Sequence, residues 1–136
     1  MAENKTRFGR KAVLDHFLGR VSHTFPTNRY LALFTADPTE LGTLTNECTG
    51  GAYARVEISD KLGNADLTTG VISNTVAIQY ATAVGDWPEI THLGVMDVIT
   101  IGAGNMIYFG PAVTARTVTN GDTYLIQIGQ LIIQEQ

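Results

Sequence analysis

The acidic side chains near residue 60 are the first candidates for chemistry in this sequence. Asp60, Asn64 and Asp66 lie close together in a stretch that superficially resembles a calcium-binding loop. Their spacing is not that of an EF-hand, and no glutamate stands where the closing bidentate ligand is needed. Aspartate and asparagine are also common in turns, where their side chains bond nearby backbone amides. We therefore interpret this stretch as a turn.

Nucleophiles and metal ligands are equally scarce. The single cysteine, Cys48, follows Glu47, and a neighbouring negative charge raises the pKa of a thiol and makes it a poor nucleophile. Because Cys48 is the only cysteine, an intrachain disulfide and a multi-cysteine zinc site are excluded. The three histidines share no metal-ligand spacing, and each is expected to be packed or on the surface: His16, His23 and His92. The sequence has no nucleophile elbow and no phosphate-binding or nucleotide-binding glycine motif, so we expect no enzyme and no cofactor.

One aromatic residue could bind a ligand. Trp87 is flanked by Asp86 and Glu89, which could line a sugar-binding rim with the indole as a stacking platform. An indole more often lies in a core or an interface, because of its large apolar surface. We favour the core or interface interpretation.

The composition points to a protein surrounded by partners. The chain has 136 residues, of which 44% are hydrophobic and only 16% are charged, against about 25% charged in an average soluble domain. Interface cores are depleted in charge, so we expect other subunits to cover much of the surface.

The net charge of -4 argues against nucleic-acid binding, although five of the nine basic residues lie within the first twenty positions. No apolar run reaches membrane-spanning length and no secretory signal is evident, so we expect neither membrane binding nor export from the cytoplasm.

The N-terminal part, residues 1–22, is predicted to be a basic arm followed by a helix. Residues 1–7 are expected to be flexible, and the helix to run from Gly9 to Leu18, with Gly19 as its stop. Its apolar residues fall on one face: Val13, Leu14, Phe17, Leu18 and Val21. A helix of about ten residues is marginal alone. We therefore expect this face to dock on the body of the protein or on a neighbouring subunit.

The remainder, residues 23–136, is predicted to be a single β-sandwich. Its centre is the stretch from Trp87 to Gly110, where two runs rich in β-branched and aromatic residues flank a glycine-containing loop. Further strands are expected over 29–35, 53–59, around 71, over 76–80, 113–119 and 124–133. The turn dipeptide Asn120-Gly121 predicts a hairpin between the last two of these. The fold class is mainly β, and a jelly-roll-like sandwich with one short helix fits best.

Several segments resemble a family of small virion proteins of tailed bacteriophages. They are RYLALFTADPTELG at 29–42, GGAYARVEI at 50–58, SNTVAIQYATAVGDWPEITHLGVMD at 73–97, NMIYFG at 105–110 and NGDTYLIQIGQLII at 120–133. The order and spacing of these motifs carry the resemblance, which extends over nearly the whole chain past Lys11. Relatives are often labelled tail fibre proteins, and others resemble the cement or decoration proteins that sit on capsids as jelly-roll trimers.

The resemblance implies a structural role. The leading hypothesis is a homotrimeric capsid cement protein that assembles in the host cytoplasm, binds the major capsid protein on the head surface and bridges coat subunits. The alternative is a tail-fibre or adhesin module that recognises a host-surface glycan. The residues predicted to make coat or intersubunit contacts are Arg7, Phe8, Arg10, Lys11, Phe17, Arg20, Trp87, Met106 and Tyr108.

Overall fold

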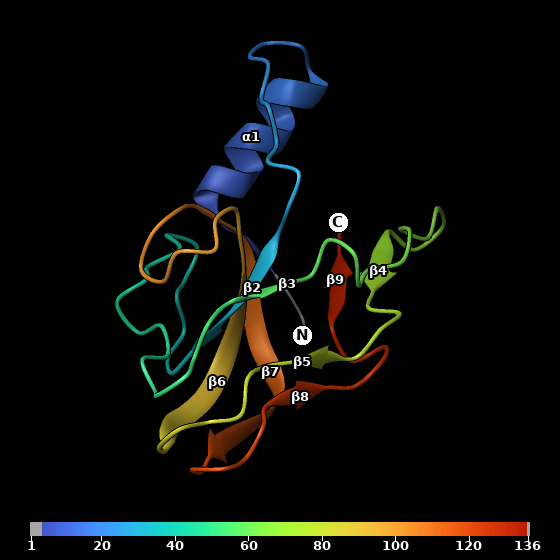
Figure 1. Ribbon diagram of the computed structural model, residues 1–136. Helices are drawn as coiled ribbons and strands as arrows, with labels where there is room; N and C mark the ends of the chain where they lie inside the picture. Colours follow the sequence, from blue (N-terminus) through green and yellow to red (C-terminus); the bar gives the residue numbers. More distant parts are fainter. Residues whose placement is uncertain (1–3, 136) are drawn as a thin grey trace.

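Two long antiparallel strands form the centre of the molecule. The computed structural model describes residues 4–135. In it β6 (Trp87–Met96) pairs with β7 (Met106–Val118), which confirms the strand pair predicted around the 97–105 loop. Both lie within a five-stranded sheet of order β1-β7-β6-β2-β3 (Figure 1). The other strands of this sheet are β1 (Asn4–Lys5), β2 (Tyr30–Phe34) and β3 (Val56–Glu57).

Two smaller sheets accompany the large one. β4 (Val71–Ser73) pairs with β9 (Ile132–Gln134), and β5 (Ile78–Gln79) pairs with β8 (Leu125–Ile126). All strand pairs in the described residues are antiparallel. Together with one helix, these sheets confirm the mainly β fold class, while the jelly-roll arrangement stays a prediction.

The strand β2 of the large sheet is buried on both faces. In β2, Leu31 and Leu33 face the main core, whereas Ala32 and Phe34 belong to a second, smaller cluster. This alternation follows from the period of two along a strand. It explains why the apolar run YLALF is continuous, as expected for a strand covered on both sides. Trp87 lies fully within the main core, where its indole N–H donates to the carbonyl of Gly51 (2.8 Å).

The prediction of a hairpin at Asn120-Gly121 is wrong, because the strands on either side of this turn do not pair with each other. A turn does form there, since Gly121 has a φ of 89° and the Asp122 amide donates to the Thr119 carbonyl. However, the predicted strand at 113–119 is the second half of β7, and it pairs with β6 rather than with the chain after the turn. The later chain is held elsewhere, because Tyr124 packs edge-to-face on Tyr80 and accepts a hydrogen bond from its amide.

The helix begins earlier than predicted. α1 (Arg7–Phe17) starts after Thr6, whose side chain accepts a hydrogen bond from the Gly9 amide and caps the helix. The prediction of a flexible arm is wrong for residues 4–7, because β1 pairs with β7 and Thr6 is buried. Residues 1–3 of the predicted arm lie outside the described residues.

Candidate functional site

Residues 7–29 project from one end of the large sheet, and we call them the helical protrusion. α1 points away from the body, and the chain that follows it returns alongside to enter β2 (Figure 1). The helix touches the body through its first turns, where Gly9 and Ala12 are buried. A Cβ atom at Gly9 would lie only 2.5 Å from the Ile107 carbonyl oxygen of β7. The absence of a side chain at Gly9 therefore lets the helix approach the sheet.

Ion pairs hold the base of the protrusion. Arg7 donates to Glu40 Oε1 from Nε (3.0 Å) and Nη2 (2.8 Å), and Arg10 Nη2 donates to Glu40 Oε2 (2.6 Å). Hydrogen bonds from Arg10 and then Arg7 lower the pKa of Glu40 below its usual range. Lys11 pairs with Asp15 one helical turn away. Three of the basic residues predicted to contact a partner thus bind acidic groups of their own chain.

The far end of α1 exposes an apolar stripe, which consists of Leu14, Phe17 and Leu18. Their exposed fractions are 59%, 79% and 70%. Residues three and four positions apart lie on one side of a helix, so these side chains form a continuous surface. The predicted apolar face therefore does not dock on the body of its own chain, which leaves the alternative of a neighbouring subunit.

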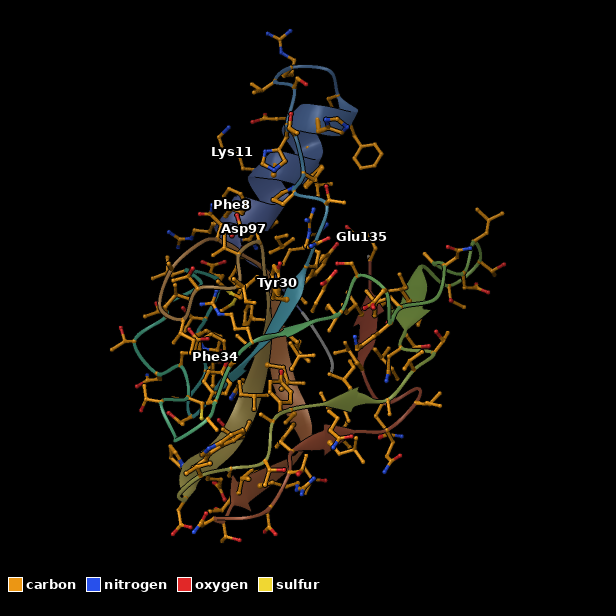
Figure 2. The ribbon with its side chains drawn as sticks, viewed as in Figure 1. Phe8, Lys11, Tyr30, Phe34, Asp97 and Glu135 are labelled. Atoms are coloured by element: carbon orange, nitrogen blue, oxygen red, sulfur yellow. The ribbon has the colours of Figure 1, made fainter. Side chains whose placement is uncertain are left out.

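Aromatic packing joins α1 to the chain that returns from it. The ring of His23 lies 4.3 Å from that of Phe25 and 5.8 Å from that of Phe8, measured between centroids. His16 packs edge-to-face on Phe25 at 5.7 Å. In Figure 2, Phe8 and Lys11 lie along the helix above the body. Phe8, predicted as a contact residue, is half-buried in this packing.

An apolar groove of about 470 Å³ lies between the protrusion and the strands β4, β6, β7 and β9. Its apolar walls come from the helix, the returning chain and the body: Val13, Phe17, Phe25, Ile58, Leu62, Ala65, Ile72, Val95, Ile107 and Ile133. Two charged residues, Arg29 and Glu135, also line it. Glu135 (labelled in Figure 2) accepts a hydrogen bond from the hydroxyl of Tyr108 (2.7 Å) and pairs with Lys5. Burial lowers the pKa of Arg29, whose guanidinium lies 5.6 Å from the Phe25 ring centroid.

The remaining predicted contact residues are divided between surface and interior. Arg20 is exposed beyond the end of α1, and Tyr108 is half-buried beside the groove. Trp87 and Met106 lie in the two core clusters and contact their own chain. The structure thus gathers Phe17, Tyr108 and the end of α1 around the groove and places the indole elsewhere.

The acidic stretch near residue 60 forms turns, as predicted. Asp66 accepts hydrogen bonds from the amides of Thr68 (2.9 Å) and Thr69 (2.7 Å), and Asp60 pairs with Lys61 (3.0 Å).

Cys48 is buried, and burial, with a smaller contribution from the Glu47 charge, raises the pKa of its thiol. Within residues 4–135, no three His, Cys, Asp or Glu side chains gather closely enough to hold a metal ion. No helix of the described chain is long and apolar enough to cross a membrane.

A buried ion pair is the main feature that sequence reasoning missed. Arg55 donates to both carboxylate oxygens of Glu47 (2.7 and 2.8 Å), and the two side chains are only 0% and 2% exposed. Arg55 also donates to the carbonyls of Val98 (2.8 Å) and Ala103 (2.9 Å), while Glu47 accepts from the Gly102 amide (2.9 Å). The pair thereby fixes the loop between β6 and β7. No local pattern connects these residues with a loop more than forty positions away.

The comparison with known families covers nearly all of this structure. The family model described as "Podophage GP4 fiber I protein gp80" matches residues 4–134. The chain belongs to this family. No curated protein matches the chain.

Membership in the podophage fibre I family supports the coarser part of the resemblance. It makes the chain a structural protein of a tailed-phage virion, without distinguishing a capsid cement protein. The matched range spans the protrusion, all three sheets and every residue lining the groove except Glu135. The fibre I family is thus defined over the protrusion as well as over the body.

Proposed function

We propose that the protein is a non-enzymatic, fibre-type structural subunit that joins a tailed-phage virion through protein contacts made by its helical protrusion. The observation that carries the proposal is the apolar stripe, which its own chain leaves exposed. Contiguous exposed apolar surface on a soluble protein marks an interaction site, because leaving it in water is unfavourable. The family description as a fibre protein supports the same role.

The distribution of charge also supports a role in assembly. Residues 1–29 carry six basic and two acidic side chains, a net charge of +4, while residues 30–136 carry three basic and eleven acidic side chains, a net charge of -8. Opposite charges on different surfaces steer association and orient the partners. The homotrimer predicted from the resemblance is part of this proposal. A partner that binds the folded protrusion stabilises it by mass action.

A capsid cement protein is the second candidate. The observation that favours it is Arg20, which is exposed at the end of the protrusion and forms no ion pair among residues 4–135. It could bind an acidic surface of the major capsid protein. Because Arg7, Arg10 and Lys11 are already paired with acids of their own chain, we rank this candidate below the fibre subunit.

Glycan recognition is not part of the proposal. The expectation of a sugar-binding rim depended on an exposed indole as a stacking platform, but Trp87 is only 1% exposed. Asp86, its expected companion, instead accepts a hydrogen bond from the Asn120 amide (2.8 Å).

Counting and locating the protein on purified particles tests the proposal. Quantitative gel analysis gives the copy number, and labelling with antibody followed by electron microscopy gives the position. A fibre subunit is expected in a few to a few dozen copies at the tail or its attachment point. Hundreds of copies spread over the head would favour the cement candidate, and particles without the protein would contradict both.

A further inference from the structure

We infer that the groove of one subunit binds the apolar stripe of a second copy of this chain. The inference deepens the proposed function, because it names the partner of the helical protrusion. It rests on three observations: the match between the two apolar surfaces, the geometry that keeps a subunit from filling its own groove, and the charges around each surface.

The stripe and the groove have matching chemistry and size. Leu14, Phe17 and Leu18 are apolar and protrude, while the groove is concave and lined mainly by aliphatic and aromatic side chains. An apolar cavity of about 150 Å³ holds one benzene ring. A groove of about 470 Å³ therefore has room for about three side chains of ring size. The stripe supplies Leu14 and Leu18 to this space, while its Phe17 also lines the groove of its own subunit.

A subunit cannot place its stripe in its own groove. Val13 and Phe17 already form the helical wall of that groove. At 100° per residue, Leu14 points about 60° and Leu18 about 100° away from the direction of Phe17. The helix cannot turn to bring them inward, because Gly9 lies against β7 and Arg7 and Arg10 bind Glu40. The subunit's own Leu14 and Leu18 therefore leave the groove open to another molecule.

Charge complementarity identifies that molecule as a second copy. One basic residue without an ion pair among residues 4–135, Arg20, follows the stripe, whereas Lys11 before it already pairs with Asp15. The two turns that line the groove carry two exposed acids, Asp66 and also Asp60, which already pairs with Lys61. The Asp66 carboxylate accepts hydrogen bonds from threonine groups of its own turn, and no ion pair engages it among residues 4–135. An interface of this kind has an apolar centre and a polar rim of opposite charges, which is the usual arrangement in protein complexes.

The contact joins two different surfaces, so it can repeat around a ring. Each copy offers one stripe and one groove, and a rotation that closes the ring leaves neither surface exposed. A ring of three copies would be the homotrimer of the proposed function. An open chain would leave one apolar stripe in water at its end, which is unfavourable.

Cysteine cross-linking between two differently marked full-length chains tests the contact. One chain carries Leu18→Cys and the other Ala65→Cys, and the native Cys48 is buried and does not compete. We expect a disulfide-linked pair when the two chains are mixed and oxidised, and only traces of linked product when either chain is oxidised alone. Linked Leu18→Cys chains alone would indicate helix-to-helix contact and overturn the inference, as would the absence of linkage in every sample.

A charge substitution in the stripe gives an independent measurement. Leu18→Asp should weaken self-association in sedimentation experiments by about tenfold or more, because it removes a buried leucine and adds a charge. Val84→Asp is the matched control, since Val84 is 71% exposed and lies outside both surfaces. Equal association of both variants and wild type would overturn the inference. So would a monomer whose mass in native mass spectrometry includes a bound apolar small molecule.

Failure of this inference can be distinguished from failure of the proposed function. If the protein is found on particles in fibre numbers but Leu18→Asp associates normally, the subunit contact is wrong and the virion role stands. If the cross-link forms but particles lack the protein, the contact stands and the virion role is wrong.

Discussion

Two regions of the molecule differ in how they are stabilised. One is the loop between β6 and β7, and the other is the helical protrusion. The loop has little regular structure, yet its backbone is held by a fully buried ion pair, Glu47 with Arg55. The protrusion contains the single regular helix of the described residues, yet it leaves Leu14, Phe17 and Leu18 in water.

This difference indicates which region satisfies its contacts within its own chain and which region leaves them for a partner. In the body, each charge of the buried pair has several hydrogen-bond partners, which is the condition for burying charge at tolerable cost. In the protrusion, only the first turns of α1 contain buried residues, and the aromatic packing with the returning chain leaves the stripe exposed. We conclude that the body folds around its own contacts, whereas the protrusion is shaped for contacts with other molecules.

The largest expected effect comes from breaking the buried pair. Glu47→Gln leaves the Arg55 guanidinium buried without its counter-charge, and should lower the free energy of unfolding by about 3–5 kcal/mol. Chemical denaturation at a fixed protein concentration measures it. The exposed Glu89→Gln is the control and should stay within about 0.5 kcal/mol of wild type. A Glu47→Gln protein as stable as this control would show that the loop does not depend on the pair.

A smaller effect is expected where the protrusion meets the sheet. Gly9→Ala places a methyl group 2.5 Å from the Ile107 carbonyl oxygen, and overpacking of this kind costs about 1–3 kcal/mol. The sign of the change in the free energy of unfolding is informative, because alanine otherwise stabilises a helix by about 1 kcal/mol relative to glycine. Denaturation followed by far-ultraviolet circular dichroism measures the change. An increase in stability would mean that α1 does not rest on β7 as described.

Removing the helix cap should affect α1 and its contact with β7, because the Thr6 hydroxyl also donates to the carbonyls of Met106 and Ile107. Thr6→Ala deletes the oxygen that accepts from the Gly9 amide (3.0 Å), a loss of about 1 kcal/mol. Amide hydrogen exchange should become faster in α1 and stay unchanged in β6. Thr6→Ser keeps the hydroxyl and should restore protection. Equal acceleration in both elements would argue against independent stability of the two regions.

The smallest effect is expected at the surface pairs. Glu40→Gln removes the partner of Arg7 and Arg10, but exposed ion pairs contribute little. Because the pKa of Glu40 is lowered in the folded protein, its contribution is complete above the ordinary glutamate pKa and is lost as the pH falls through the lowered value. Titration of the Glu40 carboxyl by nuclear magnetic resonance checks the direction. An unshifted pKa would show that these pairs do not persist in solution.

Sequence reasoning succeeded where the signal was local. The β-branched runs on either side of the 97–105 loop predicted the central strands, and the apolar run YLALF predicted a strand. The stripe of α1 was also recognisable from its spacing. Only the structure could show that the body leaves this stripe uncovered, because that depends on how Gly9 meets Ile107.

Features that depend on distant pairs were not predictable. Asn120-Gly121 indicated a turn correctly, but whether β7 pairs with the chain before or after that turn was decided by the pairing of Trp87 with Val118 and Ile90 with Arg116. Glu47 lies in a predicted polar loop and Arg55 in a predicted strand, and charged residues are normally exposed in either setting. The groove brings residues from both ends of the chain together. Hydrophobic periodicity is a local pattern and does not predict contacts between distant segments.

Hydrogen exchange at increasing protein concentration tests the central claim most directly. If the helical protrusion is completed by other copies, the amides of α1 should gain protection as concentration rises, while the amides of Leu93 to Val95 in β6 keep the same protection throughout. If the amides of α1 are already as protected as those of β6 in dilute solution, the protrusion is complete by itself and the account is contradicted.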